Sequence, residues 1–181
     1  EFGEELDVSQ AFYRDESRVA RDLAVLVASL RVDAEPLVVD ACAGAGARTL
    51  RYVRDLQYEA RIVANEPNAA ARLIENVARH PAVETRALDA GRLLREISAS
   101  GGASVVDYDG FGLSLDVHDA VRAARDGGHV LLTTTGAAAA GARGVNAREA
   151  RKARRGATAT KCDVQNELGL RMLCGRAAAA A

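Results

Sequence analysis

Residues 38–49 read VVDACAGAGART, and this stretch decides the fold. A β-branched apolar run ends at Asp40, and a turn of small residues with Gly44 and Gly46 then leads into a helix-like segment. Glycine lets a backbone approach a ligand closely, and a helix that begins after such a turn offers free N–H groups. The stretch therefore predicts a buried strand followed by a ligand-binding loop. The competing interpretation is a plain glycine-rich turn that binds nothing.

The same alternation of strand and helix continues on both sides of this loop. Short apolar runs bounded by Gly, Pro, Asp or Asn predict strands at Leu37–Ala41, Arg61–Asn65, Glu84–Leu88, Ser104–Asp109 and His129–Thr134. Helix-like stretches lie at Thr49–Gln57, Ala69–Arg79, Gly91–Ile97 and Leu115–Ala124. Strands that alternate with helices predict an α/β fold, with a mostly parallel sheet covered by helices on both faces.

The chain divides into three parts by composition. Residues 1–35 form an N-terminal segment with a helix near Ser17–Leu30, and residues 36–176 form the α/β core. Residues 177–181 are all alanine and carry no sequence information. The chain begins at Glu1 rather than Met, which is typical of a processed product or a fragment.

Composition excludes several classes of protein. No apolar run approaches the roughly 20 residues that span a bilayer, so we expect no membrane partner. Cys42, Cys162 and Cys174 form no Cys-x-x-Cys pair, which argues against a zinc site or a disulfide framework, and we expect no metal. We expect an intracellular protein. The sequence does not distinguish a nuclear location from an organelle such as a mitochondrion or plastid.

Acidic residues lie at or just after the carboxyl ends of the first three predicted strands. The dinucleotide-binding fingerprint requires a third glycine where Thr49 stands, so Asp40 and its glycines fit an S-adenosylmethionine loop better. Glu66 lies 20 residues after Gly46, where a carboxylate can accept both ribose hydroxyls; it could also be a solvated loop acid. Asp89 could contact the adenine amino group, cap the next helix, or do both.

The fourth strand leads into Asp107-Tyr108-Asp109-Gly110-Phe111-Gly112. Amino-group methyltransferases hold their target at this strand end. A carboxylate at Asp109 could orient a weakly nucleophilic exocyclic amine and take up its proton, and Phe111 could stack on an extruded base. The alternative is an Asp-Gly turn followed by a core phenylalanine.

Charge is divided unevenly along the chain. Residues 1–140 carry a net charge of −7, and residues 141–181 carry +6. Most of the excess lies in a basic segment between residues 143 and 155. Such a segment can bind RNA phosphates or can be a solvated helix. The candidate RNA-binding residues are Arg143, Arg148, Arg151, Lys152, Arg154 and Arg155.

Taken together, the motifs resemble those of the tRNA guanine-26 N2-dimethyltransferases over residues 9–174. The family loop Ser-Gly-Ile-Arg-Ser-Ile-Arg resembles Ala45–Arg51, and its pair of arginines is more specific than the glycines. The family motif Ala-Asn-Asp-x-Asn resembles Ala64–Asn68, and Asp-x-Asp-Pro-Phe-Gly-Ser resembles Asp107–Ser114. An opening Phe-Tyr motif and a closing Cys…Glu…Leu-Arg motif resemble residues 12–23 and 162–171.

The resemblance implies a Rossmann-like, class I S-adenosylmethionine-dependent methyltransferase that acts on a guanine of tRNA. Asp109 would lie at the target amine. The cofactor would be bound by Arg21, Asp40, Gly44, Gly46, Arg48, Glu66 and Asp89.

The chain departs from the family pattern in ways that favour a second hypothesis. Gly110 replaces the family proline after the catalytic acid, and Gly136 begins the stretch that replaces a family Asp-Thr-Ala. The chain also stops where the family supplies its last two strands and an RNA-binding domain, so we expect an open sheet edge that a protein partner could cover. The alternative function is thus a catalytically retired scaffold in an RNA–protein assembly such as a ribosome. The acids Asp40, Glu66, Asp89 and Asp109 favour the enzyme.

Overall fold

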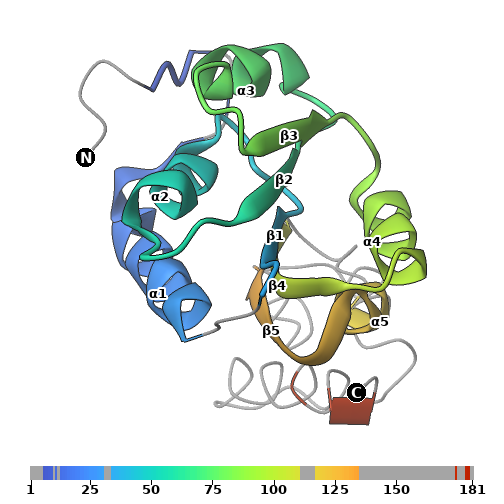
Figure 1. Cartoon of the computed structure of the whole chain (residues 1–181). Coiled ribbons are helices and arrows are strands. Elements are labelled where there is room, and N and C mark those ends of the chain that lie inside the picture. The colour runs from blue at the N-terminus through green and yellow to red at the C-terminus, as the bar shows by residue number, and fades with distance from the viewer. Residues whose placement is uncertain are drawn as a thin grey trace, which may run out of the picture.

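The computed structural model describes residues 6–9, 11, 13–30, 34–110, 117–134, 174 and 178–179. Within these ranges five strands form one parallel sheet in the order β3-β2-β1-β4-β5 (Figure 1). The strands are β1 (Leu37–Asp40), β2 (Arg61–Asn65), β3 (Val83–Arg86), β4 (Ala103–Gly110) and β5 (Ala124–Thr134). A short 3-10 turn, η2 (Asp15–Ser17), precedes the helices α1 (Arg18–Ser29), α2 (Ala47–Asp55), α3 (Ala70–Val77), α4 (Ala90–Ala99) and α5 (Val117–Ala123).

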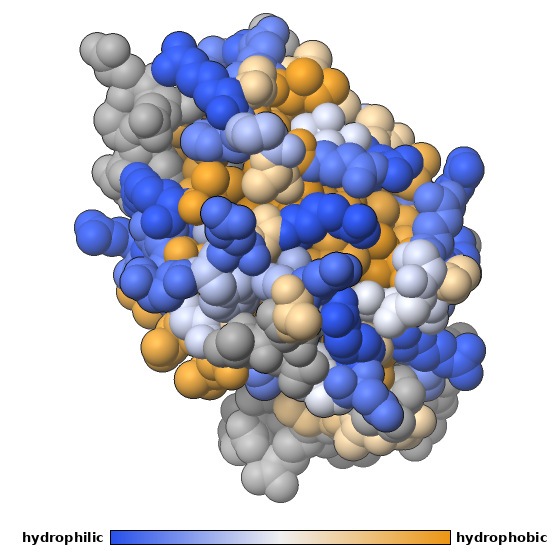
Figure 2. All heavy atoms as spheres, in the orientation of Figure 1, coloured by the Kyte–Doolittle hydropathy of each residue, from blue (hydrophilic) through white to orange (hydrophobic). Residues whose placement is uncertain are grey.

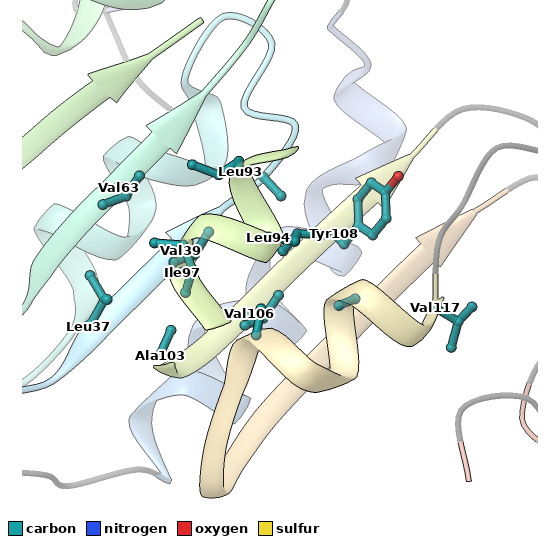
Figure 3. Close-up of a cluster of buried hydrophobic side chains, with 13 residues drawn as sticks. Leu37, Val39, Val63, Leu93, Leu94, Ile97, Ala103, Val106, Tyr108 and Val117 are labelled. Carbon is teal, nitrogen blue, oxygen red and sulfur yellow. The ribbon is translucent and has the colours of Figure 1, made fainter. Parts of the chain in front are cut away.

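Helices cover both faces of the sheet, as the sequence predicts. Alternate residues of each strand face opposite sides. Val39 and Val106 face α4 and α5, in the cluster that Figure 3 shows with Leu94 and Tyr108. Val38, Ile62 and Val105 face the other side and form a cluster with α1 and Tyr52 of α2. A third cluster joins α2 to α3 on that side. The α/β prediction is therefore confirmed.

The strand order places a break in winding between β1 and β4. From β1 the chain builds outward to β2 and β3, and it then returns to place β4 and β5 on the other side of β1. In open parallel sheets, the carboxyl ends of two strands at such a break leave a crevice in which ligands bind. The crevice here lies beyond Asp40 and Asp107, which are register partners.

A buried asparagine joins three strand ends below this crevice. The Asn65 side-chain amide donates to the carbonyl oxygens of Ala41 (3.0 Å) and Leu88 (2.9 Å), and its Oδ1 accepts from the Leu88 N–H (2.9 Å). Asn65 is fully buried, so these bonds form where water does not compete. They fix the segments that follow β1 and β3 relative to β2.

Most predicted element bounds differ from the observed ones by one or two residues, but β5 differs more. The sequence predicts a strand from His129, whereas β5 begins at Ala124. Its register with β4 shifts between Ala103 and Val105, and Gly127 has a positive φ of 67°. The polar residues and glycines of 125–128 are typical of a turn, but here they form an irregular start of the strand.

The surface of α1 carries an apolar stripe. Val19, Leu23, Leu26 and Leu30 are exposed large hydrophobic residues at helical spacing, and Figure 2 shows orange spheres at the lower left, over the α1 side of the molecule. Across the described residues, no helix combines the length and apolarity needed to cross a membrane.

Candidate active site

A cleft of about 730 Å³ opens at the carboxyl ends of the strands. Its walls come from the segment before α1, the loop after β1, the residues that follow β2 and β3, and the end of β4. Nearly all the residues predicted to bind a cofactor line this cleft, together with Asp109: Arg21, Asp40, Gly44, Arg48, Glu66 and Asp89. The topology thus brings together acids that lie up to 69 positions apart in sequence.

Some predicted residues lie elsewhere. Gly46 does not line the cleft, although it shapes the loop that does. Phe111 and the basic segment, Arg143, Arg148, Arg151, Lys152, Arg154 and Arg155, fall outside the described residues. The stacking role of Phe111 and the phosphate-binding role of the basic segment stay predictions.

The loop after β1 is bent back on itself before α2 begins. The Gly46 N–H donates to the Ala43 carbonyl at 2.8 Å, and the Gly46 carbonyl accepts the first α2 bond from Leu50. Gly46 has φ of 89°, a left-handed conformation that L side chains rarely adopt. A Cβ here would lie 3.0 Å from Leu73 Cδ1 and 3.3 Å from Val77 Cγ1. Glycine is therefore required both by the turn and by the packing of α3.

Gly46→Ala tests this requirement, with Gly101→Ala as its matched control. Gly101 also has positive φ, at 102°, but a Cβ there meets nothing within 4 Å. Both variants bear the left-handed backbone cost, so we expect Gly46→Ala to lose about 1 kcal/mol more stability, from overpacking against Leu73. Urea unfolding of both variants measures the difference. Equal losses would show that α3 yields freely to the added methyl group.

Glu66 connects the glycine loop to the loop after β2. Its Oε2 accepts from the Gly44 N–H at 3.1 Å, and its Oε1 accepts from the Asn68 N–H at 2.8 Å. Each carboxylate oxygen can accept a further bond. Glu66 is therefore fixed in orientation at the cleft wall while it keeps acceptor capacity for a ligand.

Asp89 has the capping role that the sequence suggested as one of two. It is the N-cap of α4, and its Oδ1 accepts from the Arg92 N–H at 3.0 Å. The side chain also lines the cleft, so capping and ligand contact remain compatible.

The segment before α1 forms one side of the cleft and is held by Arg21. This buried guanidinium donates to the Arg14 carbonyl (3.0 Å) and to the Tyr13 hydroxyl (3.3 Å), and it lies 5.0 Å from the centre of the Tyr13 ring. Further along, Asn76 of α3 bonds both Asp7 and the Ala45 carbonyl of the glycine loop. The N-terminal segment and the loop are thus tied to the same helix.

Three acids and one arginine cluster at the cleft: Asp40, Asp109 and Arg48 line it, and Asp107 is fully buried beside them. Arg48 of α2 donates to Asp107 Oδ1 at 2.6 Å and to Asp109 Oδ2 at 2.7 Å. The Tyr52 hydroxyl donates to Asp107 Oδ2 at 2.5 Å, and the Thr49 hydroxyl donates to Asp40 Oδ2 at 2.7 Å. Both terminal nitrogens of Arg48 therefore have carboxylate partners.

Burial shifts the proton affinity of this cluster. Burial, and then the charge of Asp107, raises the pKa of Asp40 to about 7. Burial also raises the pKa of Asp107 above its usual value and raises that of Tyr52 well above 10. Burial and the nearby charge of Asp40 raise the pKa of the Cys42 thiol to about 12, so this thiol is no nucleophile at neutral pH.

Sequence reasoning missed three residues of this network as site residues, namely Thr49, Tyr52 and Asp107. For Tyr52 and Asp107 a signal exists in their spacing. Asp107 and Asp109 are two residues apart on a strand and so share a face, and Arg48 and Tyr52 are four apart on a helix and share a face. Because the helix follows β1, which pairs with β4, these two faces meet.

Residues 4–181 match the family described as N2,N2-dimethylguanosine tRNA methyltransferase. The chain belongs to this family. A curated relative, the tRNA (guanine(26)-N(2))-dimethyltransferase of Sulfurisphaera tokodaii, is 34% identical over 131 residues, or 70% of this chain. The chain spans about a third of the length of that relative (33%).

A solved structure has the same fold. Trm1 from Pyrococcus horikoshii, determined in complex with S-adenosyl-L-methionine, superposes with a TM-score of 0.70 at 22% sequence identity. The match covers 94% of this chain and 49% of that protein. The chain thus has the methyltransferase fold that its family resemblance implies.

Proposed function

We propose that this chain is the cofactor-binding part of an S-adenosylmethionine-dependent tRNA (guanine-N2)-methyltransferase. The observation that carries the proposal is the cleft at the break between β1 and β4, where the glycine loop, Glu66, Asp89 and Asp109 converge. Membership of the family and the same fold in a cofactor-bound relative support it.

The cleft residues fit such a cofactor by their chemistry. The carboxylate of Glu66 suits two ribose hydroxyls, and Asp89 suits an adenine amino group. Asp40 and the first turn of α2 offer a carboxylate and free N–H groups to the amino acid end of the cofactor. The sulfonium, when bound, supplies an activated methyl group, so the protein has only to align donor and acceptor and exclude water.

Asp109 is the residue that we propose at the target. Its side chain is 40% exposed, at the end of β4 and facing the cleft, so a planar base could reach it. A carboxylate that accepts a hydrogen bond from the guanine amine orients the nitrogen lone pair and takes up the proton released as the N–C bond forms. Phe111, two residues on, would stack on the base.

The retired scaffold is the weaker hypothesis. Loss of cofactor binding would relax the need for Glu66 at the cleft wall and for an exposed acid at the end of β4. Both features are present in the described residues. The proposed tRNA contact of the basic segment and a protein partner at the β5 edge rest on sequence alone.

Calorimetric titration with S-adenosylmethionine tests the cofactor site, with Glu66→Ala as the informative variant. Glu66→Ala removes the acceptor of the two proposed ribose hydrogen bonds, so we expect its affinity for S-adenosylmethionine to fall at least about tenfold. The affinity of Glu66→Gln should lie between those of the wild type and Glu66→Ala. Glu59→Ala, an exposed acid before β2, is the matched control and keeps wild-type affinity.

The same titration can refute the proposal. A folded wild-type chain that gives no binding heat contradicts the cofactor site and leaves the scaffold as the better hypothesis. Equal affinity in Glu66→Ala and wild type would instead place the ribose away from Glu66.

A further inference from the structure

Arg48 occupies an unusual position for a residue of a cofactor loop. Its side chain is 8% exposed, and its two terminal nitrogens bond two different carboxylates, Asp107 at 2.6 Å and Asp109 at 2.7 Å. A planar guanidinium can bridge two acceptors in this way with a fixed geometry, because its N–H groups form a rigid fork. The orientation of one carboxylate therefore constrains the other.

Asp107 is the fixed end of this bridge. Its side chain is 0% exposed, and its second oxygen accepts from the Tyr52 hydroxyl at 2.5 Å. β4 is paired on both sides here, with β1 and with β5, so the backbone of Asp107 is held in the middle of the sheet. Arg48 is thus bound to Asp107, whose position is fixed by burial and by strand pairing on both sides.

Asp109 is the free end. One carboxylate oxygen bonds Arg48, and the side chain is otherwise half exposed to the cleft. The backbone here is still paired with β5, through Asp109 with Thr133 and Gly110 with Thr134, so the freedom lies in the Asp109 side chain. Among the side-chain bonds described here, the Arg48 bridge is what fixes the direction of this carboxylate.

We propose that Arg48, anchored by Asp107 and Tyr52, is a positioning residue that aims the Asp109 carboxylate at the acceptor amine. The proposal rests on the proposed function, since it gives Asp109 its role there. It differs from the direct cofactor contact that the family resemblance implied for Arg48. Its consequence is that Arg48 governs the rate of methyl transfer more than cofactor affinity.

Arg48→Lys separates these two roles. Lysine keeps the positive charge but is a point donor on a flexible stem, and it cannot hold two carboxylates in a fixed fork. We expect kcat for methyl transfer from labelled S-adenosylmethionine to a tRNA transcript to fall at least about tenfold, since misplacement of a reacting group is costly. The Kd for S-adenosylmethionine, measured by calorimetry, should stay within about threefold of wild type. Arg54→Lys, the same change at an exposed position of the same helix, should alter neither.

Tyr52→Phe provides a milder second variant in case Arg48→Lys unfolds the chain. It removes one hydroxyl and leaves both ion pairs of Arg48, so we expect a fall in kcat of about threefold, again with cofactor Kd unchanged. Circular dichroism of each variant shows that the fold is retained.

The outcomes distinguish this proposal from the one it rests on. An active wild type whose Arg48→Lys and Tyr52→Phe variants keep full kcat would overturn the positioning role and leave the proposed function intact. A folded Arg48→Lys variant that loses cofactor binding in step with kcat would return Arg48 to the cofactor site. A wild type that neither binds cofactor nor transfers methyl groups overturns both proposals.

Discussion

Replacing Asp109 with Asn is expected to slow methyl transfer to tRNA by about a thousandfold while the cofactor still binds. The amide keeps the size of the carboxylate and one oxygen for Arg48. It cannot accept the proton of the guanine amine, however, and its own N–H groups would face that amine as donors. An interaction that matters only as the new bond forms lowers kcat without raising the Kd of the cofactor. Labelled-methyl transfer and calorimetry measure the two quantities separately.

Asp126→Asn is the matched control for this change. Asp126 is an exposed acid in the irregular start of β5, near Ala103, at the end of the sheet opposite the cleft. The control should keep wild-type kcat. Asp109→Asn activity within about threefold of wild type would show that Asp109 does not contact the acceptor. The proposed cofactor site would not be contradicted by that result, because it is tested by the Kd for S-adenosylmethionine and not by the activity of Asp109→Asn.

The fold followed from local sequence because its signals are local. The stretch 38–49 carries a β-branched strand, a glycine turn and a helix start, and each of these is set by residues next to one another. Parallel pairing then places the carboxyl ends of all the strands at one edge of the sheet, so the acids at or just after the ends of β1, β2, β3 and β4 lie together there. The beginning of β5 was not predictable in the same way. Its polar residues favour a turn, and pairing with Ala103 overrides that preference.

The hydrogen bonds and ion pairs within the site were harder to predict, because they depend on how helix α2 packs on the sheet. Sequence motifs place Arg48 in a cofactor loop, but they do not say which way its side chain points. A buried guanidinium requires charged partners, and Asp107 and Asp109 supply them from a strand 59 and 61 positions away. In the sequence Tyr52 likewise resembles a core aromatic residue. Only the structure shows that its hydroxyl donates to Asp107.

The second large effect that we expect is a fall in the free energy of unfolding as pH rises, caused by the ionisation of buried Asp40. Asp40 is fully buried beside its register partner Asp107, with Arg48 and Thr49 above it from α2 and Asp109 further along β4. Burial, and then Asp107, raises its pKa to about 7, whereas in the unfolded chain it ionises near its ordinary value of 3.8. Between these values the folded chain holds a proton that the unfolded chain has lost. The contribution of Asp40 to the free energy of unfolding therefore falls as pH rises from about 4 to 7 and levels off above it.

Asp40→Asn should remove this dependence. The asparagine oxygen can still accept from the Thr49 hydroxyl, and its amide can donate to Asp107 in place of the repulsion between two acids. The free energy of unfolding of the variant minus that of the wild type should rise by on the order of 2 kcal/mol as the pH is raised from 5 to 8. Urea unfolding of both proteins at each pH measures this, and the contributions of titrating groups that do not interact with Asp40 cancel in the difference. A difference that stays constant with pH would mean that Asp40 ionises normally in the folded chain.

The same proton links Asp40 to the proposed cofactor. The ammonium and sulfonium of S-adenosylmethionine are cations, and a cation bound near Asp40 favours its ionised form. Binding below about pH 7, where the empty site is protonated, should therefore release a proton. Calorimetry at pH 6.5 in two buffers of different ionisation enthalpy should give different heats for the wild type and equal heats for Asp40→Asn. Equal heats for the wild type would place the cationic end of the cofactor away from Asp40, even if the stability measurement comes out as expected.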